Sequence, residues 1–272
     1  LSIGAVSASG IDTLSGQLSG LGASGITAGG DALVRNLAGD LVLQAGISAH
    51  AIDLVTAGAL QNAAGATLTA ANGWRIWASS WVGETRGGLA GNGALPNLYG
   101  CTFNGACAAT APAAGGNYFI YQQQPTASIV IGSATREYGL ANPAFTYSVT
   151  GAVLGDGQGS VASGTPTSAA TIGSNVGAYA ITGNFTSPAG YALQFAPGTL
   201  SITPATLVFT ADEWIRYFGF ANPDFTGTFS GFRNGDTLQG VFGGEESIYS
   251  PAEPGSVMGY YPIYASGSAL NY

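Results

Sequence analysis

The chain has 272 residues, of which only 7% are charged, and its formal net charge is −8. Its six basic residues are all arginine and are too few to form the basic patch that neutralises phosphates, so nucleic acid is excluded as a partner. The longest apolar runs are broken before they reach membrane-spanning length, and the 44 glycines are typical of a solenoid with tight turns.

Residues 1–81 contain short apolar triplets separated by Gly, Ser, Asn and Asp. The outer residues of each triplet lie on one face of a strand, so the pattern predicts strand–turn units of about twenty residues, stacked as rungs of a right-handed parallel β-helix. The alanine-rich stretch 45–66 could form a helix instead, but each of its three glycines would cost about 1 kcal/mol there, and strands are favoured. The segments are Leu1–Ile3, Leu33–Val34, Leu41–Leu43, Ile52–Leu54, Leu60, Ala66–Leu68 and Trp74–Ile76.

Residues 82–127 are predicted to cap the last rung and to connect it to the C-terminal half of the chain. Trp74, Trp77 and Trp81 supply apolar surface for such a cap, which an open solenoid end requires. The only cysteines, Cys101 and Cys107, flank an Asn-Gly turn pair, and in a secreted-looking chain they predict a disulfide; the alternative is two unlinked small apolar residues. With one histidine in the chain, no metal site and no cofactor are expected.

One stretch then occurs twice, at residues 136–146 and 216–226. Each copy leads through alternating apolar residues into a Gly-Asp turn, at residues 155–156 and 235–236, which predicts a strand entering a hairpin or loop. A repeat at this period indicates tandem modules, a first over 128–204 and a second over 205–272. The residues that define the repeat are Arg136, Gly139, Asn142, Pro143 and Phe145, matched by Arg216, Gly219, Asn222, Pro223 and Phe225.

The second copy of the repeat reaches Tyr272 without a counterpart of Leu193–Thr203, the last strand expected in the first module. The chain also begins in mid-pattern at Leu1, which indicates a fragment or a processed product. Two explanations for the missing strand remain: the sequence is cut at this point, or a neighbouring subunit donates the strand by β-augmentation.

The repeated motif, followed by Val176–Thr182, Gly190-Tyr191 and Phe195–Thr203, resembles the glycine-rich MBG β modules of bacterial surface and secreted adhesins. The stretch Leu68–Ser80 with Gly87–Leu89 and Asn117–Tyr121 is similar to the end of the β-helix in filamentous-haemagglutinin-like, two-partner-secreted exoproteins. The resemblance implies an extracellular location and no catalytic residue.

The expected protein is therefore all-β: a β-helix end followed by two small β-sandwich-like modules. The expected function is structural or adhesive at a bacterial surface, through self-association into a fibre or through binding to a host or matrix surface. An alternative is a glycan-binding module that uses some of the 13 Tyr and 4 Trp as stacking faces. A polysaccharide-acting enzyme that uses Asp31, Asp40 or Asp53 is less favoured, and we expect no turnover.

Overall fold

The computed structural model of the chain describes residues 6–8, 11–15 and 25–272, so the expected triplet Leu1–Ile3 lies outside the described residues. Within them the chain is almost entirely β, which confirms the predicted fold class. It forms two compact units, one of residues 1–130, 148–165 and 184–196, the other of residues 131–147, 166–183 and 197–272. The division passes through the first module, and the four-segment organisation expected from the sequence stays a prediction.

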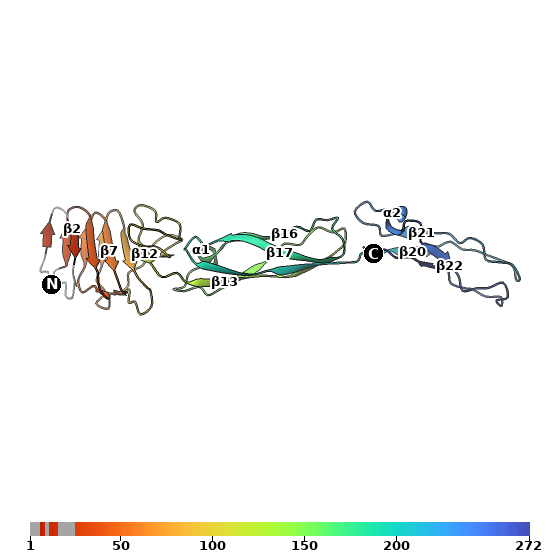
Figure 1. The fold of residues 1–272 in the computed structure, drawn as a ribbon, viewed down its shortest axis with the longest axis horizontal. Helices are drawn as coiled ribbons and strands as arrows, with labels where there is room; N and C mark the ends of the chain where they lie inside the picture. Colours follow the sequence, from red (N-terminus) through yellow and green to blue (C-terminus); the bar gives the residue numbers. More distant parts are fainter. Residues whose placement is uncertain (1–5, 9–10, 16–24) are drawn as a thin grey trace. The chain divides into compact units, whose positions relative to one another are not determined.

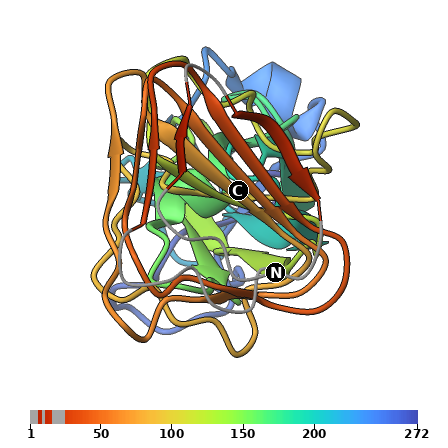
Figure 2. The ribbon, with the colours of Figure 1, turned by 90° about the vertical axis from the view of Figure 1, so that its left-hand side faces the viewer.

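The first unit begins with a β-helix whose strands pair in parallel from rung to rung (Figure 1). Figure 2 views the β-helix along its axis, so that successive rungs lie one behind another. The register Ile26↔Ile47↔Leu68 gives the predicted spacing of about twenty residues per rung. One sheet comprises β1 (Val6–Ala8), β3 (Ile26–Ala28), β6 (Ile47–Ala49) and β9 (Leu68–Ala70), and a short pair comprises β5 (Leu41–Val42) and β8 (Leu60–Gln61). The largest sheet comprises β2 (Ile11–Ser15), β4 (Ala32–Asn36), β7 (Ile52–Thr56), β10 (Trp74–Ala78), β12 (Tyr118–Tyr121) and β11 (Asn97–Tyr99).

Alternation along these strands builds the core. Val34, Leu54 and Ile76 occupy matching positions in β4, β7 and β10, and all three are fully buried. Within each strand, the residues on either side of these positions face outward, as the two-residue period of a strand requires. Trp74 of β10 continues the stack toward β12, where its ring meets Phe119 edge-to-face at 5.1 Å between centroids. Trp74, which the sequence predicted to contribute apolar surface to the cap, is buried.

The first module has two sheets. One contains β15 (Tyr147–Thr150), β13 (Thr126–Ile131) and β18 (Ala192–Ala196); the other contains β14 (Ala134–Glu137), β19 (Gly198–Thr203), β17 (Gly177–Thr186) and β16 (Ser163–Ser168). β13 pairs in parallel with β18, and β14 with β19. The Gly-Asp turn is followed by a one-turn helix, α1 (Gln158–Val161), which the sequence interpretation did not anticipate.

The second module is more sparsely packed. It contains two antiparallel strand pairs, β20 (Val208–Ala211) with β21 (Gly227–Ser230) and β22 (Ser247–Tyr249) with β23 (Tyr264–Ser266), and the short helix α2 (Leu238–Phe242). In the part of the chain that the structure describes, no strand lies beside β20 in the way that β18 lies beside β13. Accordingly Phe209, the counterpart of the fully buried Ile129, is only half-buried.

The repeated arginine and asparagine make the same pair of hydrogen bonds in both modules, which we call the staple. In the first, the Arg136 guanidinium donates to the carbonyl of Thr171 and the Asn142 amide donates to that of Ala170 at 2.7 Å. In the second, Arg216 donates to the carbonyl of Glu253 and Asn222 to that of Ala252. Gly139 and Gly219 take left-handed φ values of +77° and +85°, which explains why glycine stands at both turns. Pro143 and Pro223 follow the asparagines, and Phe145 and Phe225 are half-buried.

Candidate functional site

The most developed polar cluster in the first unit lies where the β-helix cap meets the base of the first module. There the Asp156 carboxylate accepts hydrogen bonds from the Tyr99 and Tyr191 hydroxyls and from the Asn97 amide, each at 2.7 Å. The rings of Tyr99 and Tyr191 meet edge-to-face at 4.9 Å. Tyr99 and Asn97 lie in β11 of the cap, whereas Asp156 and Tyr191 belong to the module. We call these four residues the first joint.

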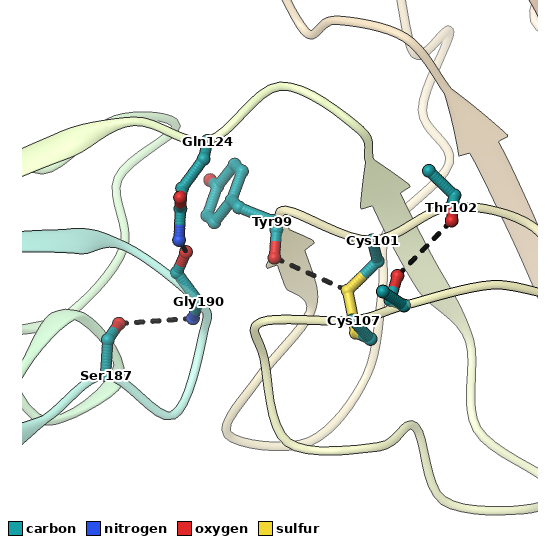
Figure 3. The surroundings of a disulfide bond; sticks show 8 residues. Tyr99, Cys101, Thr102, Cys107, Gln124, Ser187 and Gly190 are labelled. Carbon is teal, nitrogen blue, oxygen red and sulfur yellow. Dashed lines mark hydrogen bonds between the residues drawn. A yellow bond between two sulfur atoms is a disulfide. The ribbon is translucent and has the colours of Figure 1, made fainter.

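Hydrogen bonds to the backbone of the 187–190 turn hold the same joint together, and Figure 3 shows the one from Gln124 to Gly190. The Tyr99 N–H donates to the carbonyl of Ala189 at 2.8 Å, and the Gln124 amide donates to the carbonyl of Gly190 at 2.8 Å. Gly190 has a φ of +92°, and a Cβ there would lie 2.3 Å from the Tyr99 carbonyl oxygen. Only glycine therefore allows the module's turn to approach β11 this closely.

A second set of polar groups supports Tyr99 from the β-helix side. Arg86 donates to the Asn97 side-chain oxygen and to the Tyr121 hydroxyl, both at 2.8 Å, and pairs with Glu84 at 2.7 Å. The Arg86 guanidinium also lies over the Phe119 ring at 3.8 Å. Tyr121 stacks on Tyr99 at 5.5 Å between centroids. The orientation of Asn97 and Tyr99 toward Asp156 is thus fixed by a network rather than by one contact.

Burial is the main cause of the shifted pKa values in the first joint. It raises the pKa of Tyr191 to about 12, with a further contribution from the hydrogen bond to Asp156. Burial likewise raises the pKa of Tyr99 and of Tyr121. For Arg86, burial acts to lower the pKa, but the electrostatic interactions and hydrogen bonds with Tyr121 and Glu84 outweigh it and the pKa is raised. The tyrosines are consequently neutral donors across the physiological pH range.

The second unit contains an equivalent cluster, the second joint, between the first and second modules. The Tyr272 hydroxyl donates to the Asp236 carboxylate at 2.8 Å, and the Tyr138 ring of the first module meets the Tyr272 ring edge-to-face at 5.6 Å. Arg233 pairs with Glu137 at 3.6 Å. Burial raises the pKa of Tyr272 as well. Tyr272 and Asp236 occupy the positions of Tyr191 and Asp156 in the repeat.

Sequence reasoning identified the two Gly-Asp turns and the matching tyrosines but did not bring them together. The signal was present: Tyr191 follows Asp156 by 35 residues, and Tyr272 follows Asp236 by 36. A polar residue and an aromatic residue that recur together at a nearly constant spacing in a repeat indicate a shared contact.

The predicted disulfide between Cys101 and Cys107 is present. It closes a loop that lies against β12 and covers Leu98 and Ile120, both fully buried. Figure 3 places the loop next to Tyr99 and the 187–190 turn. The Thr110 N–H of this segment donates to the carbonyl of Pro188 at 2.9 Å, so the loop also contributes to the first joint.

The three aspartates considered for catalysis have separate partners. Asp31 contacts His50 at 2.7 Å on the exposed surface, as expected for polar residues at a solenoid turn. Asp40 accepts from the Ala59 N–H at 2.9 Å. Asp53 accepts from the Arg75 guanidinium at 2.6 Å and from the Trp77 indole N–H at 2.9 Å. Each carboxylate thus orders local backbone or side chains.

A cleft of about 370 Å³ lies on the outer face of the six-stranded sheet, beside the disulfide loop. It is lined by Asp53, Arg75 and Trp77 from the sheet and by Thr102–Gly105 from the loop. The rings of Trp77 and Phe103 meet edge-to-face at 5.5 Å, and Trp77 is only half-buried. Within the described residues, no group of three or more metal-binding side chains occurs.

The family profile of the MBG domain (YGX type) matches residues 127–201 and again residues 207–272. The chain belongs to the MBG domain family. Its two MBG domains correspond to the repeat found in the sequence, and Tyr138-Gly139 directly follows β14 in the first one. No curated protein and no solved structure matches the chain.

MBG domains are β-rich domains of extracellular and surface proteins. No helix in the described part of this chain has the length and apolar character needed to cross a membrane. Both MBG domains carry the Tyr–Asp pair at the base, and in both the pair contacts an aromatic residue from the preceding segment. The pair is therefore a joint-forming element of the two MBG domains.

Proposed function

We propose that this protein is a structural or adhesive protein of a bacterial surface, secreted in the manner of filamentous-haemagglutinin-like exoproteins, and that it has no catalytic activity. Its function would be to present or space other elements as part of a stalk or fibre. The observation that carries the proposal is the repeated joint. If the segments were independent binding modules, they would not need a fixed contact between an aromatic residue of one segment and a Tyr–Asp pair of the next, and this chain has two such contacts.

Limited proteolysis tests this proposal directly. If the joints fix each segment to the next, the segments 122–126 and 203–207 resist a broad-specificity protease such as proteinase K in the intact chain. The Asp156→Ala variant then becomes cleavable near 122–126 while 203–207 stays resistant, which serves as an internal control. Rapid cleavage of both segments in the unaltered chain would contradict the proposal, because it would mean that the segments are flexibly tethered.

Self-association through strand donation is the sharper form of the proposal. In the first module β18 and β19 complete the two sheets, and in the second module β20 has only β21 as a partner among the described strands. An added peptide of residues 192–203 tests whether this edge accepts a strand. We expect saturable binding and slower amide exchange in β20. A scrambled peptide is the control, and equal effects of both peptides would refute donation.

A second candidate function is glycan binding in the cleft beside the disulfide loop. The half-buried Trp77 ring next to Asp53 and Arg75 supports it, because sugars bind to aromatic faces flanked by polar groups. A glycan array followed by calorimetry with Trp77→Ala tests this candidate. Trp81→Ala is the comparison, since Trp81 packs on Tyr99 and Tyr121. A blank array removes the candidate.

A further inference from the structure

The second module carries a group of exposed apolar side chains at the end away from its Tyr–Asp pair. Phe218 is 75% exposed and Met258 is 101% exposed, and Tyr217, Phe220 and Val257 are each at least two-thirds exposed. We call these five residues the second tip. A cluster of this kind is unusual on a protein surface and typically marks an interaction site.

The counterparts of these residues in the first module are engaged. The repeat places Phe218 at the position of Tyr138, which is 4% exposed and contacts the Tyr272 ring of the second module. It places Met258 at the position of Val176, whose N–H donates to the Asn271 side chain at 3.0 Å. The first tip is thus covered by the base of the following module.

The two tips have the same local construction, so the comparison holds residue by residue. The Tyr179 hydroxyl donates to the carbonyl of Asn175, and the Tyr261 hydroxyl donates to that of Val257, both at 2.9 Å. The arginine and asparagine staples also coincide. Trp214, Arg216 and Tyr261 are left out of the second tip, because their counterparts pair with β19 and a strand in that place would cover them. The backbone of Glu137, the counterpart of Tyr217, also pairs with β19, but its side chain is 49% exposed and reaches Arg233, so Tyr217 is kept.

We propose that the second tip is a docking site for the base of another MBG-type module, whose Tyr–Asp pair receives Phe218 as Tyr272 and Asp236 receive Tyr138. This inference rests on the proposed function, in which such joints connect successive segments.

The base of a module is the end that carries its Tyr–Asp pair. The residues of the second tip also determine which module base would fit against it. In the second joint Glu137 pairs with Arg233, and Asn175 accepts from Asn271 at 3.0 Å. At the second tip, the uncharged residues Tyr217 and Val257 replace Glu137 and Asn175, so the carboxylate that pairs with Arg233 and the amide oxygen that accepts from Asn271 are both absent. A base with uncharged residues at those positions is the better match. The base of the first module has this character, with Val153 and Gly190 where the second has Arg233 and Asn271.

Met258 is the single methionine of the chain and therefore reports on the tip through its oxidation by peroxide. Three extended chains are compared by mass spectrometry. One carries a copy of residues 192–204 after Tyr272, which supplies the strand alone. A second carries the same copy followed by residues 127–204, which adds a base with Val153 and Gly190. A third carries a copy of residues 192–272, which adds a base with Arg233 and Asn271.

We expect Met258 oxidation to slow roughly tenfold in the second chain relative to the first, as for a site that is closed most of the time, and to slow less in the third. Phe218→Asp in the second chain restores the rate of the first. Because the two added modules have different sequences, a folding defect in one leaves the other as a test. Equal oxidation in all three chains would overturn the docking proposal, while cleavage at 203–207 of the unaltered chain would instead overturn the proposed function.

Discussion

Replacing Asp156 by alanine tests the first joint most directly. The substitution removes the acceptor for the Tyr99 hydroxyl and the Asn97 amide, and both side chains are at most 2% exposed. A buried donor left without a partner costs about 1–3 kcal/mol, so the free energy of opening this region is expected to fall by about 2–6 kcal/mol. Tyr191 adds less, because its hydroxyl can still donate to the Val153 carbonyl at 3.4 Å.

Asp236→Ala is the matched control, since Asp236 occupies the same position in the second module. It accepts one side-chain hydrogen bond in the joint, from the half-buried Tyr272, and its loss is expected to cost about 1 kcal/mol. Hydrogen exchange of the peptides containing residues 97–101 and 189–192 measures the opening free energy of the first joint. An equal effect of the two substitutions on their own joints would refute the reasoning.

Three further predictions concern the same region. Burial raises the pKa of Tyr99, Tyr121 and Tyr191, the last to about 12. The folded state therefore keeps protons that the unfolded chain releases near the normal tyrosine pKa of about 10. The stability that these tyrosines contribute is complete below about pH 10 and is lost as the pH rises toward 12. A urea midpoint that stays constant over that window would contradict this. Reducing the disulfide between Cys101 and Cys107 should cost about 2 kcal/mol from loop entropy, measured by urea titration with and without reductant; an unchanged midpoint would count against it. Gly190→Ala should destabilise the first joint by clearly more than Gly155→Ala destabilises its own turn. Both glycines have a positive φ, but only at Gly190 would a Cβ lie 2.3 Å from a backbone oxygen. Similar changes in hydrogen exchange in the two variants would contradict this prediction.

The rungs and the tandem modules could be predicted because both are local or repeated. The triplets around Val34, Leu54 and Ile76 alternate with the two-residue period of a strand, and that period alone determines which side chains face inward. The duplicated arginine and asparagine stand in both copies, so their structural role is visible before any contact is known.

The joints could not be predicted because they depend on partners far apart in the sequence. Tyr99 and Asp156 are separated by 57 residues, and neither residue type specifies the other. The short helices α1 and α2 were also missed, since four or five residues give no helical period. The cap tryptophans divide by environment: Trp74 is buried, whereas Trp77 and Trp81 are half-buried, a difference that depends on the disulfide loop and the tyrosine stack.

The parallel pairing of β13 with β18 in the first module has a mechanical consequence. β13 enters the module and β18 lies parallel to it, with Thr126 opposite Ala192 and Val130 opposite Ala196. Tension along the chain would slide these two strands past each other, so that the hydrogen bonds between them bear the load together. Antiparallel neighbours pulled from one end would unzip bond by bond. This strand order therefore suits a protein that must hold under traction.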